Sequence, residues 1–166
     1  TDWLDLIFSP ASMQNYDLSI SGGNSSTTYA FSTGYLDQEG IMEGSAFQRY
    51  TLRLGLTHKM NDDLTIGANM NSALAQHDRL PANAAYFGQP PGIVYSAMVH
   101  SPVVAPYNDD GTINQRNNQG FLGGGTSSAS NPLAIMKYIS EDIQNTRIFG
   151  NMFADYNLNE NISFKS

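Results

Sequence analysis

The chain contains no cysteine and few charged residues. Its 166 residues include 8 Lys and Arg against 15 Asp and Glu, and charged residues make up 14% of the chain. That share is well below the roughly 25% of an ordinary soluble domain. The absence of cysteine excludes a disulfide framework and a thiolate metal site. The net charge of −7 argues against a surface that binds nucleic acid.

The sequence also has no long hydrophobic run. The longest stretch without Asp, Glu, Lys or Arg is Leu80–Asn108, and five prolines interrupt it. This stretch is therefore excluded as a membrane-spanning helix. Residues 1–17 have neither the basic nor the apolar region of a secretory signal peptide. A β-barrel is not excluded, because its alternating strands leave the mean hydropathy near neutral.

Apolar and polar residues alternate along six segments of the chain, as they do in half-buried strands. These segments are Gln14–Gly22, Thr28–Leu36, Arg49–Met60, Leu64–Ala75, Thr146–Leu158 and Ile162–Ser166. The complete segments are about ten residues long, the length that crosses a bilayer as a tilted strand. In the fifth segment, Phe149 and Phe153 break the pattern on its polar side. We therefore predict an all-β chain of about six antiparallel strands.

The connections between these segments alternate in length. Three are short and rich in turn-forming residues: Gly23–Ser26, Asn61–Asp63 and Asn159–Asn161. Two are longer: Asp37–Gln48 and Asp78–Asn145. Short turns at one end and long loops at the other are typical of outer-membrane barrels. Because six strands do not close such a barrel, we expect the chain to be part of a longer protein.

Short helices are expected outside these strands. Trp3, Ile7 and Phe8 are spaced so that they share one helical face. Pro91–His100 has a proline near its start, and Asn131 precedes a second helical segment as its N-cap. The residues Tyr107–Gly111 predict a turn. We divide the chain into a connecting segment (1–12), two hairpins of barrel strands (13–77), a long extracellular loop (78–145) and further barrel strands (146–166).

No catalytic or metal-binding motif is found. The three histidines, His58, His77 and His100, lack the spacing of a metal-binding pair. The glycine tract at 123–125 is not followed by the lysine of a phosphate-binding loop. The turn at residues 108–111 does not align with a calcium-binding loop. We expect no enzymatic activity, no cofactor and no resident metal.

Strand alternation divides the side chains into two candidate faces. A charge on the lipid side near the bilayer midplane costs about 2–4 kcal/mol, so the polar parity is expected to face the lumen. The predicted lumen-facing residues are Asp17, Arg49, Arg53, Asn69, Asn71, Arg147, Asn151 and Asp155. The predicted lipid-facing residues are Tyr16, Leu18, Ile20, Tyr29, Phe31, Tyr50, Leu52, Leu54, Leu56, Ile66, Met70, Met152 and Tyr156.

The long loop holds the candidates for contact with a ligand or partner. Loops on a rigid scaffold often carry function, and aromatic rings offer flat apolar faces. The candidates are Tyr86, Phe87, Tyr95, Tyr107 and Arg116. The alternative is that these side chains only pack the loop on itself.

Several ordered motifs resemble one family. They are residues 1–8 (TDWLDLIF), 14–24 (QNYDLSISGGN), 34–41 (GYLDQEGI) and 47–50 (FQRY), followed by 131–133 (NPL) and 150–156 (GNMFADY). Together they resemble the SusC/RagA family of TonB-linked outer-membrane transporters of Bacteroidota. The likeness is nearly gapless over residues 1–75 and loose between 76 and 130, around PYNDDG at 106–111. One departure lies at residues 9–13, where the family often carries a basic residue.

The resemblance implies a 22-stranded barrel around an N-terminal plug, with this chain supplying early barrel strands after the plug. It also implies import of glycans or peptides across the outer membrane, driven by the TonB complex. A SusD-like surface lipoprotein is the implied partner at the extracellular mouth. The family's plug and TonB-contacting region have no counterpart in this chain.

Two other interpretations remain open from the residues themselves. One is a soluble all-β module that binds carbohydrate or a surface, with its apolar parity buried between two sheets. The other is a small structural barrel, which would need to close within about eight strands.

Overall fold

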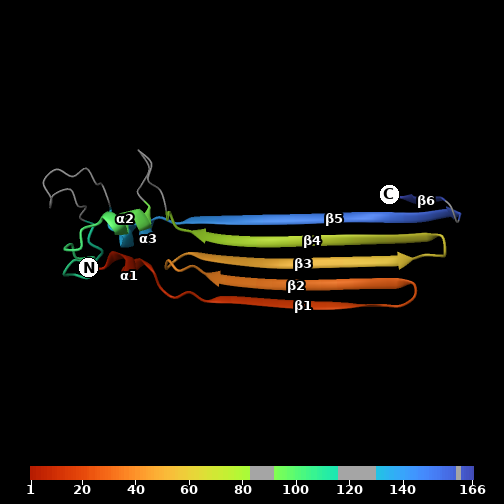
Figure 1. Cartoon of the computed structure of the whole chain (residues 1–166), viewed down its shortest axis with the longest axis horizontal. Helices are drawn as coiled ribbons and strands as arrows, with labels where there is room; N and C mark the ends of the chain where they lie inside the picture. Colours follow the sequence, from red (N-terminus) through yellow and green to blue (C-terminus); the bar gives the residue numbers. More distant parts are fainter. Residues whose placement is uncertain (83–91, 116–129, 160–161) are drawn as a thin grey trace. The chain divides into compact units, whose positions relative to one another are not determined.

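The computed structural model describes residues 1–82, 92–115, 130–159 and 162–166. The described part contains six strands in one sheet, with spatial order β1-β2-β3-β4-β5-β6 (Figure 1). The strands are β1 (Met13–Gly23), β2 (Thr27–Glu39), β3 (Ala46–Lys59), β4 (Leu64–Arg79), β5 (Glu141–Asn159) and β6 (Ile162–Lys165). Each strand therefore pairs with its neighbour in sequence, and all six predicted strands are confirmed.

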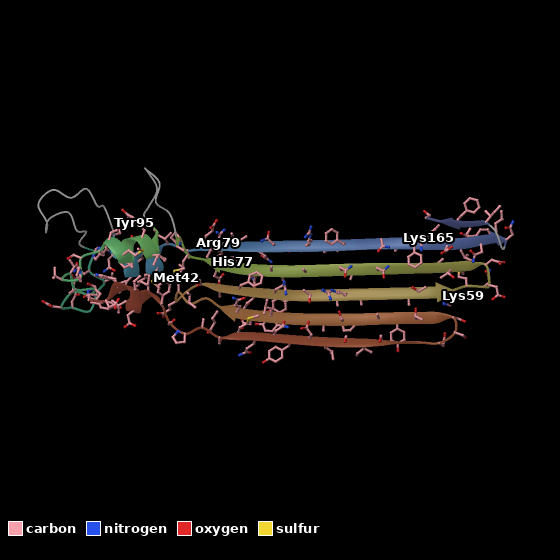
Figure 2. All side chains as sticks on the ribbon, in the orientation of Figure 1. Met42, Lys59, His77, Arg79, Tyr95 and Lys165 are labelled. Carbon is pink, nitrogen blue, oxygen red and sulfur yellow. The ribbon has the colours of Figure 1, made fainter. Side chains whose placement is uncertain are left out.

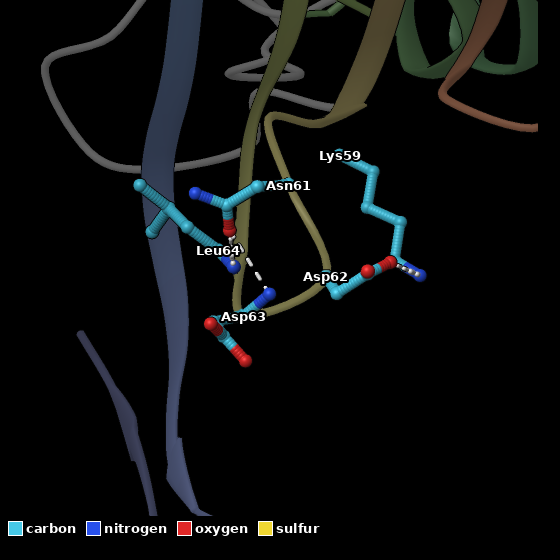
Figure 3. A network of polar contacts seen from close by, with 5 residues as sticks. All are labelled: Lys59, Asn61, Asp62, Asp63 and Leu64. Carbon is cyan, nitrogen blue, oxygen red and sulfur yellow. Dashed lines mark hydrogen bonds and ion pairs between the residues drawn. The ribbon is translucent and has the colours of Figure 1, made fainter.

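Two of the short turns use the same side-chain device. In the β1–β2 turn, Oδ1 of Asn24 accepts hydrogen bonds from the backbone N–H groups of Ser26 and Thr27, at 2.9 and 2.8 Å. In the β3–β4 turn, Oδ1 of Asn61 accepts from Asp63 and Leu64 at 2.9 and 2.8 Å (Figure 3). An asparagine oxygen that satisfies two turn N–H groups fixes the hairpin, which explains why turns form at these residues.

The strands extend beyond their alternating segments, and the connections are shorter than predicted. β2 continues to Glu39, whose backbone N–H donates to the carbonyl of Ser12 at 2.9 Å. The link between β2 and β3 is residues 40–45, so the prediction of a long link at Asp37–Gln48 is wrong. Alternation ends before the backbone ladder does, because the ladder needs only N–H and C=O partners. Gly44 takes a φ of +88° in this link, which favours glycine.

Three short helices form a compact unit from residues 1–12, 38–47 and 77–143. They are α1 (Trp3–Ile7), α2 (Ile93–Val99) and α3 (Pro132–Tyr138). The buried apolar side chains of this unit are Trp3, Ile7, Leu80, Ile93, Ala97 and Ile135. No helix in the described ranges is long and apolar enough to span a membrane.

Helix α1 differs from the prediction at one residue. Trp3 and Ile7 are buried, but Phe8 is 38% exposed. The helix ends at Ile7, and Phe8 is extended and forms a β-bridge with Met42. Because the change to extended backbone turns its side chain away, Phe8 does not share the buried face.

The second unit consists of residues 13–37, 48–76 and 144–166. It holds most of the length of the six strands and carries the candidate site.

Candidate functional site

Contacts at two glycines show which side chains share the polar face of the sheet. A Cβ at Gly34 would lie 2.5 Å from Oδ1 of Asp17 and 2.8 Å from Oγ1 of Thr51. A Cβ at Gly55 would lie 3.3 Å from Oδ1 of Asn69. Strands β1 to β4 therefore present these residues on one side.

Phe153 extends the same face to β5, because its ring occupies the space above Gly67. Side chains alternate along each strand, so the predicted lumen-facing residues all fall on this face. They are Asp17, Arg49, Arg53, Asn69, Asn71, Arg147, Asn151 and Asp155. The structure thus places the whole set on one face of the sheet, while the exposure of these side chains to a lumen stays a prediction.

Cationic side chains accompany the two phenylalanines that break the alternation. The guanidinium of Arg147 lies 4.6 Å from the ring centroid of Phe149. The Nζ of Lys165 lies 5.5 Å from the ring centroid of Phe153 and 4.0 Å from Oδ2 of Asp155. Cation–π contacts of this kind let an aromatic ring occupy a polar face. Lys165 (Figure 2) was missed from the sequence, because only the pairing of Asp155 with Lys165 across β5 and β6 brings it there.

The middle of the polar face contains a shallow hollow of about 530 Å³. Ala30 and Gly55 leave space beneath it, and its polar lining offers hydroxyl, amide and guanidinium groups from Ser19, Ser21, Ser32, Arg53, Asn69, Asn71 and Asn151. These groups can hydrogen-bond a hydroxyl-rich or amide-rich chain.

The opposite face of the sheet is apolar and exposed. Met152 is 86% exposed and Leu18 is 57% exposed. A hollow of about 760 Å³ is lined by six of the residues predicted to face lipid: Tyr29, Phe31, Leu54, Leu56, Met70 and Met152. By strand alternation this face also carries Tyr16, Ile20, Tyr50, Leu52, Ile66 and Tyr156. An exposed apolar surface of this kind marks an interaction with a membrane or a partner.

Asn131 organises the helical unit, a role that exceeds the predicted N-cap. Its Oδ1 accepts from the backbone N–H of Leu133 at 2.9 Å, which confirms the cap. Its Nδ2 donates to the carbonyls of Pro106 and Asn114 at 3.0 and 2.8 Å, and the residue is 1% exposed. These partners are 25 and 17 residues away in sequence, so no local pattern could reveal them.

Two of the predicted loop contacts lie in the described part of the chain. Tyr95 stands on α2 and is 43% exposed (Figure 2). Tyr107 is 48% exposed and forms a β-bridge with Ile113 across the predicted turn. Tyr86, Phe87 and Arg116 lie outside the described residues. Their contact with a ligand or partner stays a prediction.

The same turn holds an acidic group with a shifted pKa. The hydroxyl of Thr112 donates to Oδ1 of Asp110 at 2.6 Å, and the backbone N–H of Thr112 donates to it at 2.9 Å. These hydrogen bonds hold the pKa of Asp110 below its ordinary value of 3.8. Among residues 1–82, 92–115, 130–159 and 162–166, no group of three or more His, Asp or Glu side chains is arranged to hold a metal.

Comparison with known proteins relates this segment to a group of bacterial receptors, although no family model matches it. The chain is 30% identical over 161 residues to TonB-dependent receptor P26 of Formosa agariphila, covering 96% of the chain. It is 28% identical over 163 residues to TonB-dependent receptor SusC of Bacteroides thetaiotaomicron. Its fold matches a chain of the RagAB peptide transporter with a TM-score of 0.67 and 26% identity over 99% of the chain.

The chain is a relative of the SusC/RagA-type TonB-dependent receptors. It spans 14% of P26, 16% of SusC and 18% of the matched RagAB chain. The antiparallel all-β fold and the outer-membrane location of these receptors agree with the predictions from the sequence. The relatives are receptors and transporters rather than enzymes, which agrees with the expected lack of catalysis.

Proposed function

We propose that this segment forms part of the barrel wall of a TonB-dependent outer-membrane transporter. The observation that carries the proposal is the two-faced sheet. One side of β1 to β5 carries the charged and amide residues predicted to face the lumen, and the other exposes tyrosine, leucine, isoleucine and methionine along the middle of the strands. A barrel wall between a watery lumen and lipid requires this division of side chains.

The imported nutrient is an oligomer, either an oligosaccharide or a peptide. Hydroxyl and amide groups in the hollow of the polar face suit the hydrogen-bonding groups of both. The matched RagAB structure is described as a peptide transporter, which supports the peptide. Another relative is named TonB-dependent receptor SusC, and that name does not state which nutrient the relative imports.

The whole transporter takes its energy from the TonB complex of the inner membrane and works with a SusD-like surface lipoprotein. Support comes from the names of the relatives, which are TonB-dependent receptors. The loop predicted at residues 78–145 is then extracellular, and among its described residues Tyr95 and Tyr107 offer exposed rings to the lipoprotein or to the nutrient.

A pair of arginine substitutions at the middle of the strands tests the proposal in the intact polypeptide that carries this segment. Leu54 lies on the apolar face and Asn69 lies on the polar face. An arginine facing lipid at this depth costs about 2–4 kcal/mol, whereas one facing water costs little. We expect Leu54→Arg to reduce the folded protein in outer-membrane fractions and Asn69→Arg to leave it near the wild-type amount.

Equal amounts of both variants in the outer membrane would contradict the lipid-facing assignment. Recovery of the wild-type polypeptide in the soluble fraction would instead favour a soluble all-β binding module.

Uptake of fluorescent oligosaccharides and peptides by cells with and without the protein then separates the two nutrient classes.

A further inference from the structure

The apolar face ends at a line of polar side chains that crosses five strands. Asp17 lies beside Gly34, and Nε2 of Gln48 donates to Oδ1 of Asp37 at 3.3 Å. Counting back three residues along β1 and forward three along β2 places Gln14 opposite Asp37. Gln14, Asp37 and Gln48 therefore lie in one row on β1, β2 and β3.

The row continues onto β4 and β5. The rings of Phe47 and His77 pack edge to face at 5.6 Å, and the backbone N–H of Met60 donates to Leu64 at 2.8 Å. Both contacts give the same pairing of β3 with β4, which places Gln76 opposite Gln48. The contact of Phe153 with Gly67 and the hydrogen bond from Asn157 to Asp63 likewise place Gln144 opposite Gln76. We call these five residues, Gln14, Asp37, Gln48, Gln76 and Gln144, the polar row.

Tyrosines stand one step nearer to the middle of the sheet. Tyr16, Tyr35 and Tyr50 each lie two residues from the member of the polar row on their own strand. The ring centroids of Tyr35 and Tyr50 are 4.9 Å apart. The hydroxyl of Tyr16 reaches the row, because it donates to Oε1 of Gln14 at 3.1 Å. Tyrosine rings concentrate where the hydrocarbon of a bilayer meets its headgroups.

The distance to the other end of the apolar face fits a bilayer. On β3 that end is marked by His58, whose Nδ1 lies 2.7 Å from Oγ1 of Thr27. From Gln48 to His58, β3 rises about 33 Å at roughly 3.3 Å per residue. A strand tilt of about 40° reduces this to about 25 Å, the height of the apolar band of an outer-membrane barrel. Gln48 therefore lies at the headgroup layer, and because the strands are about 4.8 Å apart, the same tilt changes the depth of the polar row by about 3 Å from each strand to the next.

We propose that the polar row binds the sugar headgroups of a glycolipid, an inference that rests on the proposed barrel wall. Primary amides both donate and accept hydrogen bonds, as sugar hydroxyls do. Asp37 only accepts, and its carboxylate has lone pairs left for a sugar O–H beside the hydrogen bond from Gln48. The five residues include no basic side chain, and a carboxylate disfavours the phosphate of a phospholipid. The row thus matches hydroxyl-rich headgroups better than phosphate-rich ones.

The first experiment measures depth by spin labels on the full-length protein in lipopolysaccharide-containing vesicles. Labels replace Gln48, Leu52, Leu54 and Leu56 one at a time, and collisions with oxygen and with a water-soluble nickel chelate are compared. We expect oxygen access at 52, 54 and 56 and nickel access at 48. Oxygen access at 48 equal to that at 54 would overturn the inference and keep the barrel wall. Nickel access at 52, 54 and 56 would instead overturn the proposed function.

The second experiment measures the lipopolysaccharide and phospholipid that co-purify with the folded protein. The variant Gln48→Leu with Gln76→Leu removes two adjacent amides of the row. The control is Asn15→Leu with Asn145→Leu. These two amides follow Gln14 and Gln144 in the sequence, but their strand parity places them on the polar face. We expect a several-fold lower ratio of lipopolysaccharide to protein in the first variant alone. An unchanged ratio, or a loss confined to phospholipid, would overturn glycolipid binding.

Discussion

The ring of Phe153 on β5 fills the space above Gly67 on β4, so that even a methyl group at residue 67 would overlap Cζ and Cε1 of the ring. The backbone carbonyl of Leu56 closes the same space, 3.0 Å from that methyl position. Residue 67 therefore has to be glycine for the Phe153 ring to keep this position. An aromatic ring over a glycine is a recognised way to stabilise the register of neighbouring strands.

Gly67→Ala is expected to displace the Phe153 ring and to destabilise the assembled sheet. Forcing extra volume into a packed site costs about 1–3 kcal/mol. The measurement is the denaturant midpoint of the full-length protein, followed by the mobility of folded and heated samples on gels. Gly150→Ala is the control, because its Cβ would lie 3.5 Å from the carbonyl of Asn69, an ordinary contact. A Gly67→Ala midpoint equal to the control's would show that the ring moves without cost.

Substitutions at Asn131 separate its two roles in the helical unit. Asn131→Asp keeps the acceptor for Leu133 but removes the donors to Pro106 and Asn114. Asn131→Ala removes both, and loss of an N-cap adds about 1 kcal/mol to the cost of unpaired buried groups. We expect the rate of proteolysis within residues 92–138 to rise for Asn131→Asp and to rise further for Asn131→Ala. Identical rates in wild type and both variants would argue against the network.

The β3–β4 turn is expected to depend on Asn61 and not on the ion pair beside it. Asn61→Ala leaves the N–H groups of Asp63 and Leu64 without their side-chain acceptor, at a cost of about 1 kcal/mol. Lys59 and Asp62 are separated by 3.9 Å and both are exposed, so Asp62→Ala should change stability little. Thermal unfolding of the two full-length variants makes the comparison. A larger loss for Asp62→Ala would reverse the assignment.

The turn around Asp110 is expected to weaken in acid. Because the pKa of Asp110 is lowered in the folded protein, its contribution is complete above the ordinary value of 3.8 and is lost as the pH falls through the lowered pKa. Thr112→Val removes the hydroxyl and keeps the backbone N–H, so the pKa of Asp110 should move back toward 3.8. Titration of the Asp110 carboxyl carbon by NMR measures both values, and an unshifted pKa in the variant would refute the cause.

The sequence alone determined the strands, their two faces and the family resemblance. Alternation with a period of two is a local property. It identified all six strands, and it assigned residues such as Asp17, Leu54 and Asn69 to one face of the sheet or the other. The turns at Asn24 and Asn61 were also predictable, because each asparagine bonds backbone groups two and three residues away.

The tertiary structure decided which residues of different strands meet. Alternation assigns a face to each residue but not its position relative to the next strand. The contact of Phe153 with Gly67, the pairing of Asp155 with Lys165 and the alignment of the polar row therefore appear only once the strands are paired. The same holds for Asn131, whose buried carbonyl partners come from distant parts of the chain. The early end of α1 at Ile7 likewise follows from the β-bridge that holds Phe8 against Met42.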